Sequence, residues 1–136
     1  MEKHKVEWFI QKHREMWNWI ADQILERKIL LDIAEAKLTW CLEIGLAPIS
    51  GCFACECKYA IHEACSRCEY AYCRKGCLFN WVESSENFVS CIGRKSSLYV
   101  RCTNARTYRK QAELARKIAN LPVREEVVEF AKSLGM

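Results

Sequence analysis

The stretch CFACECKYAIHEACSRCEYAYCRKGC, residues 52–77, decides how this chain is expected to fold, because it holds seven of the ten cysteines together with one histidine. It contains two C-x2-C pairs, Cys52 with Cys55 and Cys65 with Cys68. Two such pairs can supply four thiolates to one tetrahedral zinc ion, at about 2.3 Å each. The spacing therefore predicts a structural Zn²⁺ site, a zinc knuckle, with these four cysteines as ligands.

The remaining side chains of this stretch leave other ligand sets open. Cys57 follows Cys55 in a C-x-C pair that can bridge two metals, and Cys73 and Cys77 are spaced by about one helical turn. These cysteines are alternate ligands, as is His62, which we expect to be an exposed loop residue. A second zinc and an iron–sulfur cluster are further alternatives, although the C-x2-C-x2-C-x3-C-P run is absent. Outside the stretch, Cys41, Cys91 and Cys102 lie on apparent apolar faces and are expected to be buried.

Whether the clustered cysteines bind a metal or form disulfides depends on the redox conditions of the compartment. The N-terminus lacks the apolar region and cleavage site of a signal peptide, and no apolar run reaches about 18 residues. This predicts a soluble protein of the cytoplasm, where thiols stay reduced and clustered cysteines bind metals. A secreted disulfide scaffold is the alternative.

Helical periodicity surrounds the cysteine-rich stretch on both sides. We expect one mainly α domain over residues 1–136, with two N-terminal helices in 1–45, an irregular zinc knuckle in 52–82 and two C-terminal helices in 97–135. The second helix is predicted to begin after an Asp32 cap and to end at Gly45. A long helix is predicted from Ser97 to residue 119, and the last helix from Pro122. The expected apolar faces are Val6, Phe9, Ile10, His13, Met16, Trp17, Ile20, Ile24 and Leu31; Ala34, Leu38, Cys41 and Leu42; Leu98, Cys102, Ala105, Tyr108, Ala112, Ala115 and Ala119; and Val123, Val127, Phe130, Ala131 and Leu134.

No sequence signal of an enzyme is found. The chain has no H-E-x-x-H, no G-x-S-x-G and no Gly-rich phosphate loop. The spacing of His62 and Glu63 from Cys65 does not fit a zinc deaminase, and a four-thiolate site leaves no open position for water. We therefore expect a non-enzymatic protein.

Two surfaces are candidates for binding a partner. Residues 94–124 carry nine basic residues and one acidic residue, so the net charge of +4 is concentrated there. Basic side chains can contact nucleic-acid phosphates, and Tyr99 and Tyr108 could stack on bases. On the first predicted helix, Trp8 and Trp19 lie off the core stripe, which predicts either a protein-binding surface or a second buried face. The tentative nucleic-acid contacts are Arg94, Lys95, Arg101, Arg106, Arg109, Lys110, Arg116 and Lys117.

Several short motifs taken together resemble a group of short phage and prophage proteins. They are M-W-N-W-I-A at 16–21, C-F-A-C-E at 52–56, C-S-R-C-E at 65–69, C-L at 77–78 followed by Trp81, and A-R-K-I-A-N-L-P at 115–122. The chain departs from that pattern at Glu69, where proline is usual, and by its additional Cys57 and Cys73. The resemblance implies a phage origin and a zinc-knuckle shape, and it implies no reaction.

Together these features predict a structural-zinc protein that serves as a phage-type accessory factor and binds and modulates a host protein. Nucleic-acid binding through 94–117 is the alternative. A homodimer is possible, and no membrane partner is expected.

Overall fold

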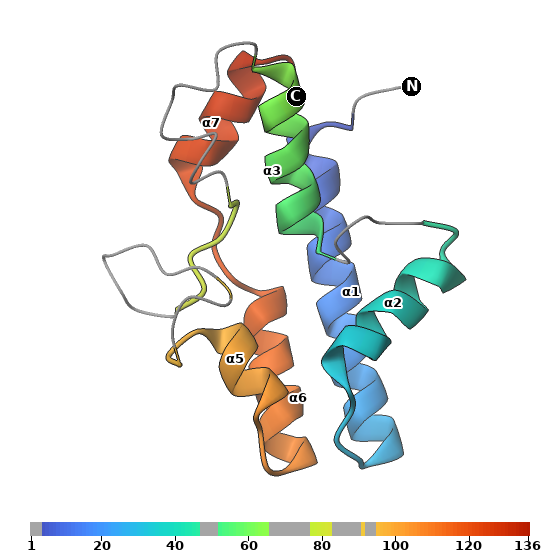
Figure 1. Cartoon of the computed structure of the whole chain (residues 1–136). Helices are drawn as coiled ribbons and strands as arrows, with labels where there is room; N and C mark the ends of the chain where they lie inside the picture. Colours follow the sequence, from blue (N-terminus) through green and yellow to red (C-terminus); the bar gives the residue numbers. More distant parts are fainter. Residues whose placement is uncertain (1–3, 47–51, 66–76, 83–90, 92–94) are drawn as a thin grey trace.

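The computed structural model describes residues 4–46, 52–65, 77–82, 91 and 95–136, and these residues form a mainly helical fold. The described helices are α1 (Val6–Arg27), α2 (Ile33–Glu43), α3 (Phe53–Ala64), α5 (Leu98–Thr103), α6 (Tyr108–Ala119) and α7 (Glu125–Ser133) (Figure 1). Within the described part there is no strand, only an isolated bridge between Phe79 and Val123. The predicted fold class is confirmed at this level, and none of these helices is long and apolar enough to cross a membrane.

The pairing of α1 with α6 forms the centre of the core. The two helices run antiparallel, since His13 bonds Ile118 and Asn18 bonds Arg116, so that positions rise along α1 as they fall along α6. The predicted α1 stripe is buried as expected, apart from Ile10 and Leu31, which are half-buried, and Leu31 lies beyond the end of the helix. Burying one such Ile or Met side chain contributes about 1.5–3 kcal/mol. The buried residues of α6 are Gln111, Ala112, Leu114, Ala115, Ile118 and Ala119, and its alanines let the two helices approach closely.

His13 is a polar residue at the centre of this core. Its Nε2 lies 2.9 Å from the Ile118 carbonyl oxygen and therefore donates to it, while Nδ1 has no hydrogen-bond partner among the described residues. Its ring stacks on Phe79 with centroids 4.0 Å apart. Desolvation lowers the pKa of His13 to about 4, against the smaller raising effect of the Ile118 carbonyl. The imidazole is thus neutral at physiological pH.

Gln111 fastens the connection between α1 and α2 to α6. Its side-chain oxygen accepts the Leu31 backbone N–H at 2.9 Å, and its Nε2 donates to the Leu31 carbonyl at 2.9 Å. A buried amide that satisfies both backbone groups of one residue fixes the position of that residue. The turn at Leu31 is therefore held to a helix 80 positions further along the chain.

The predicted long helix from Ser97 is wrong, because the chain breaks it between Asn104 and Thr107. The Thr107 side chain accepts the Lys110 backbone N–H at 3.2 Å and begins α6 as its N-cap. Ser97 does not cap α5 with its side chain, and its hydroxyl instead donates to the Cys91 carbonyl. The break lets α5 fold back on α6, and the predicted Ala105 and Tyr108 are only half-buried.

The start and end of α2 were predicted correctly, but its buried face was not. The Asp32 carboxylate accepts the Glu35 N–H at 3.2 Å, and Gly45 follows the helix with a φ of 77°. The predicted face residues Leu38 and Leu42 are 52% and 64% exposed, and Ala34 is exposed as well. The helix has apolar residues on both sides, and packing buries the side with the largest ring. That side consists of Ile33, Ala36, Lys37, Trp40 and Cys41.

The middle of the chain is less irregular than predicted, because residues 53–64 form α3. This segment contains neither Gly nor Pro, and Phe53, Ala54, Cys57 and Ile61 form one buried helical face. The rest of the predicted knuckle, residues 66–76, lies outside the described residues.

The last helix begins later than predicted, at Glu125 and not at Pro122. The preceding residues run along the segment 78–79 instead, where the Arg124 N–H donates to the Leu78 carbonyl at 2.7 Å and Val123 forms its bridge to Phe79. As expected, Glu125 and Glu126 lie in the first turn of α7. The helix buries Val127, Val128 and Ala131, while Val123, Phe130 and Leu134 pack partly buried against the core.

Candidate metal centre

Cys52 and Cys55 lie together at the start of α3. Cys52 is the buried N-cap residue of α3, and Cys55 lies three positions further on in the first turn. Hydrogen bonding with the Cys55 side chain is the largest effect on Cys52 and lowers the pKa of its thiol in spite of its burial. The same thiol–thiol bond, together with burial, raises the pKa of Cys55. The start of α3 therefore stabilises a thiolate, the form of cysteine that binds metals.

Cys77 has a similar set of donors. Its sulfur accepts the Phe79 backbone N–H and the indole N–H of Trp81, whose Nε1 lies 3.3 Å away. Burial raises the pKa of this thiol, and the two donors partly oppose that effect. The Arg124 guanidinium donates to the Cys77 carbonyl at 3.0 Å.

Cys91 lies half-buried against the same core. Its carbonyl accepts the hydroxyl of buried Ser97 at 2.5 Å, and the next residue, Leu98, donates its N–H to the Trp81 carbonyl at 2.8 Å. Burial raises the pKa of the Cys91 thiol, and the charges of Cys52 and Cys77 raise it further. Cys91 was expected in the core, but it lies at the core's edge, within electrostatic range of two other cysteines.

The other cysteines occupy different places. Cys41 and Cys102 are fully buried, as predicted. Cys57 is also fully buried, and desolvation raises its pKa to about 12. Cys65 follows the last turn of α3, about 15 Å along the helix axis from Cys55 at about 1.5 Å per residue. Two sulfurs on one zinc are only about 4 Å apart, so this conformation does not bring Cys65 to the Cys52–Cys55 pair.

The remaining predicted ligands add nothing to the cluster in the described part of the chain. His62 is exposed on α3, and Cys68 and Cys73 lie outside the described residues. Among the residues that the structure describes, no three His, Cys, Asp or Glu side chains are already arranged around one point as a metal site. The thiols are neighbours that would have to turn toward a common ion.

Two cations flank the cysteine neighbours. Lys37 of α2 is buried, its ammonium lies 4.9 Å from the Tyr99 ring centroid, and its charge lowers the pKa of Cys52 and Cys91. Arg124 acts on Cys77 in the same direction. The surroundings therefore favour negative charge on this group of sulfurs.

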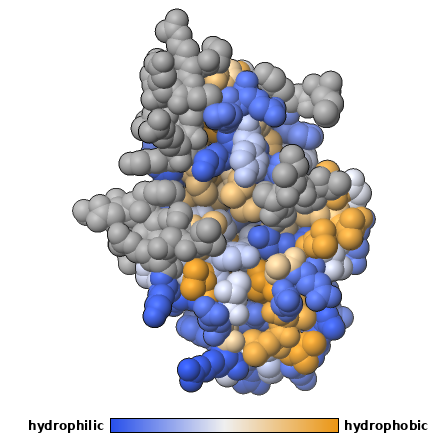
Figure 2. All heavy atoms as spheres, viewed as in Figure 1, coloured by the Kyte–Doolittle hydropathy of each residue, from blue (hydrophilic) through white to orange (hydrophobic). Residues whose placement is uncertain are grey.

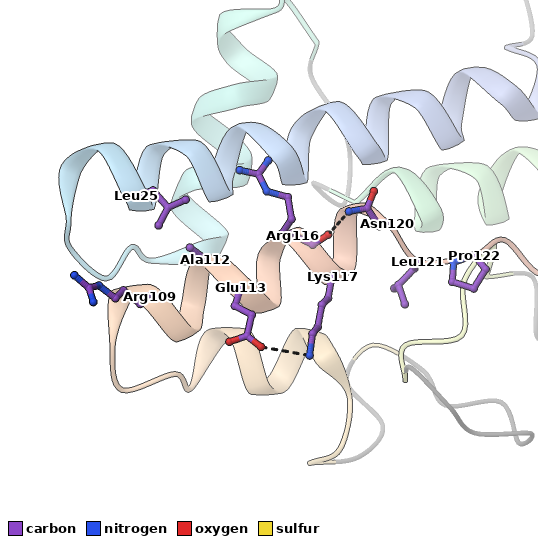
Figure 3. Close-up of a pocket in the computed structure, with 9 residues that line it drawn as sticks. All are labelled: Leu25, Arg109, Ala112, Glu113, Arg116, Lys117, Asn120, Leu121 and Pro122. Carbon is purple, nitrogen blue, oxygen red and sulfur yellow. Dashed lines mark hydrogen bonds and ion pairs between the residues drawn. The ribbon is translucent and has the colours of Figure 1, made fainter.

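The basic segment is partly engaged within the protein itself. Arg116 donates to Asp22 at 2.6 Å and to Asn18 at 2.8 Å, which ties α6 to α1. Lys110 and Lys117 both approach Glu113, at 3.4 and 3.5 Å. Figure 3 shows three of these side chains, Glu113, Arg116 and Lys117, around a groove of about 640 Å³ that Arg109 and Pro122 also line. The groove therefore combines acidic, basic and apolar side chains.

The other predicted basic contacts are placed as follows. Lys95, Arg106, Arg109 and Lys110 are exposed, Arg101, Arg116 and Lys117 are half-buried, and Arg94 lies outside the described residues. These positions do not by themselves distinguish a nucleic-acid surface from a solvated helix face.

Trp8 and Trp19, the tentative partner surface, are both half-buried and pack against the core. Trp8 stacks on His4 with centroids 3.7 Å apart and meets the Phe53 edge at 5.7 Å. The first ring is thus covered in part by the protein's own aromatic residues.

The sequence predictions missed Cys91 and Lys37 as neighbours of this centre. Cys91 belongs to no C-x2-C pair. Lys37 lies on α2, whose predicted buried face was Ala34, Leu38, Cys41 and Leu42 and did not include it. The only sequence signal for Cys91 was that one more cysteine follows the cluster.

Comparison of the chain with protein-family models, curated proteins and solved structures finds no match.

Proposed function

We propose that this chain is a non-enzymatic protein that binds one structural zinc ion, with Cys52 and Cys55 as two of its ligands. The observation that carries the proposal is the pairing of two cysteines in the first turn of α3, where interaction with the Cys55 side chain lowers the pKa of the buried Cys52 thiol. Hydrogen bonds to a charged acceptor are stronger than those between neutral groups, and donors around a metal-bound thiolate orient and stabilise it. Thiolate ligands select zinc among the common divalent ions.

The role of the ion in this proposal is structural. A site filled by four thiolates keeps no open position for a reacting water, so it stabilises the fold without catalysing a reaction. The helices α1 and α6 pack through apolar side chains and need no metal. Zinc would instead hold the start of α3 to the other cysteine-bearing parts of the chain.

The test is the metal content of purified protein and of paired variants. We expect about one zinc per chain, lost in Cys52→Ser and Cys55→Ser and kept in Cys102→Ser, which alters an equally buried cysteine of the helical core. A wild-type protein that binds no zinc, and melts identically with and without a chelator, would overturn the proposal.

We further propose, from the resemblance to phage proteins, that the zinc-ordered domain is an accessory factor that binds a host protein. Exposed apolar side chains support this part of the proposal. They are Leu25, Ile29, Leu30, Leu38, Leu42 and Ile44, each 42–64% exposed, and Figure 2 shows orange areas over α2 and near the end of α1 with hydrophilic atoms between them. Exposed apolar surface can mark an interaction site.

The partner proposal is tested with the double variant Leu38→Ser, Leu42→Ser, and with light scattering of the wild-type chain. We expect a monomeric chain whose captured host protein is lost in the double variant and kept in Trp8→Ala. A stable dimer that the double variant dissociates would assign these side chains to a second copy instead. Nucleic-acid binding through 94–117 stays a prediction, checked by whether any affinity falls steeply with salt.

A further inference from the structure

We infer that the groove of about 640 Å³ along α6 binds an acidic amphipathic peptide segment of a partner protein. This α6 groove is bounded by Leu25 of α1, by the face of α6 that runs from Arg109 to Asn120, and by Pro122 (Figure 3). The inference goes beyond the proposed function, because the groove contains no cysteine and none of the exposed leucines of α2.

The shape of the α6 groove suits a short segment. The residues that α6 contributes recur with the spacing of one helical face, and they are Arg109, Ala112, Glu113, Arg116, Lys117 and Asn120. This face is about 16 Å long at about 1.5 Å per residue, the length of about three helical turns. An amphipathic helix of the same length presents its apolar side chains to such a groove at positions i, i+3 or i+4, and i+7.

The groove has apolar side chains that a partner can cover. Leu25 is 46% exposed, and Figure 3 shows it reaching from α1 toward Ala112 of α6. Ala112 and Leu121 are almost completely buried, and Ala112 adds only a methyl group between the longer side chains on either side of it. Ligand-binding clefts of about 300–1,000 Å³ are typically lined in this way, by apolar groups with a few polar ones at fixed positions. The partner segment must therefore supply apolar side chains.

Arg109 provides a positive charge at one end of the groove. It is exposed, its Nε donates to the Tyr108 hydroxyl at 3.3 Å, and its guanidinium carbon lies 5.8 Å from the centroid of that ring. In the described part of the chain, Arg109 has no carboxylate partner. A guanidinium binds a carboxylate through two parallel hydrogen bonds, so this end favours an Asp or Glu of the partner.

The middle of α6 also carries more positive than negative charge. Lys110 and Lys117 both approach the carboxylate of Glu113, at 3.4 and 3.5 Å, and Arg116 donates to Asp22 at 2.6 Å. Two carboxylates therefore face three basic side chains. Exposed ion pairs contribute little to stability, so the lysines can turn toward a partner at small cost. Complementary charge on that partner favours encounter and fixes its orientation in the groove.

The same residues favour a peptide over a nucleic acid. Proteins that bind single strands stack bases on exposed aromatic rings. Here Tyr99 packs half-buried against the core, and Tyr108 lies under the Arg109 guanidinium. The groove places Leu25 and Pro122 beside its cations instead. A phosphate backbone has no apolar group to cover these two side chains, whereas an amphipathic peptide supplies apolar and acidic side chains together.

The first experiment measures binding of a synthetic peptide by fluorescence anisotropy. The probe is a labelled helix of about 12 residues, with leucines on one face and glutamates beside them. We expect micromolar affinity, weakened at least about 10-fold when the glutamates are replaced by glutamine or the leucines by alanine. Equal binding of the glutamine peptide, or no binding of the acidic one, would overturn the inference. Tighter binding of a DNA oligonucleotide would overturn it as well.

The second experiment places the peptide on the protein. Arg109→Glu should weaken binding by at least about 10-fold and Leu25→Ala by about 5-fold. The matched controls Lys95→Glu and Leu42→Ala alter an exposed basic residue and an exposed leucine outside the groove, and they should change nothing. Circular dichroism checks the helices of each variant. An equal loss in Lys95→Glu would mean unspecific charge attraction and overturn the inference.

Metal content is measured on the same samples, which keeps the two proposals apart. Protein that holds no zinc and still binds the peptide contradicts the proposed function and supports this inference. Zinc-containing protein that does not bind the peptide overturns this inference alone. Amide shifts in NMR spectra give the same answer without any variant, since they should be confined to α6 and the end of α1. Shifts on α2 instead would overturn the inference.

Discussion

Cys102 and Cys52 are both buried cysteines, and the comparison between them separates the two regions of this molecule. Cys102 lies in the helical region, its thiol donates to the Gln111 carbonyl at 3.6 Å, and desolvation alone raises its pKa to about 12. Cys52 lies in the cysteine region, and hydrogen bonding with the Cys55 side chain lowers its pKa in spite of its burial. Burial favours the neutral thiol, and a donor directed at the sulfur favours the thiolate, the form of cysteine that can bind a metal.

The largest expected effect concerns the helical region. Trp17 is 1% exposed on the face of α1 that packs in the core, and Trp17→Ala leaves a large cavity. We expect the free energy of unfolding to fall by about 3–5 kcal/mol. Urea denaturation with and without a chelator measures this, and the loss should be similar in both conditions because α1 and α6 pack through apolar side chains. A loss seen only in zinc-loaded protein would join the two regions into one cooperative unit.

The next prediction uses pH to test the helical region alone, on metal-free protein. The unfolded chain protonates His13 near pH 6.5, whereas the folded chain does so only near pH 4. The contribution of neutral His13 is therefore complete above about pH 6.5 and is lost as the pH falls toward 4, about 3 kcal/mol in all. Denaturation midpoints between pH 7.5 and 4 should show this slope. His13→Gln should flatten it, and the exposed His62→Gln should not.

A smaller effect should appear in the cysteine region when the indole N–H is removed and the ring is kept. Trp81→Phe preserves most of the packing against Tyr99 and Phe79 but loses the donor 3.3 Å from the Cys77 sulfur. We expect zinc affinity to fall by about 10-fold, which corresponds to about 1.4 kcal/mol. Trp17→Phe in the helical region is the matched control and should leave zinc affinity unchanged. An unchanged affinity in Trp81→Phe would remove the indole from the metal site.

The smallest effects separate the two faces of α2 and the cap of α6. Thr107→Ala should cost about 1 kcal/mol, because the Lys110 N–H loses its partner. Leu42→Ala should change stability by less than about 0.5 kcal/mol, since its side chain is 64% exposed. Thermal melts measure both. A large loss in Leu42→Ala would mean that this apolar face is covered in solution.

The sequence predicted those elements whose cause is local. The buried stripe of α1 follows from the helical spacing of its apolar residues. The Asp32 cap and Gly45 mark the ends of α2 within a few residues. The break between α5 and α6 was missed because Tyr108 and Ala105 continue the period, and only the packing of α5 against α6 shows that the chain turns. The buried face of α2 was missed for a related reason. Both of its sides are apolar, so tertiary packing decides which side is buried.

In the candidate site, the spacing predicts Cys52 and Cys55 as ligands and Cys77, paired with Cys73, as an alternate, whereas Cys91 was expected in the core. The surroundings of Cys77 and Cys91 depend on the bonds of Ser97, Trp81 and Arg124 across the fold. A residue that is brought to a site by long-range bonds leaves no local sequence pattern.

The antiparallel pairing of α1 with α6 has a consequence for how the chain is made. A ribosome that has just completed α1 must still add about 90 residues before α6 exists, which takes about 5–20 s at about 5–20 residues per second. During that time Met16, Trp17 and Ile20 have no α6 to cover them. We expect the nascent chain to be a substrate for chaperones that bind apolar segments, and truncations that end before α6 to aggregate during synthesis.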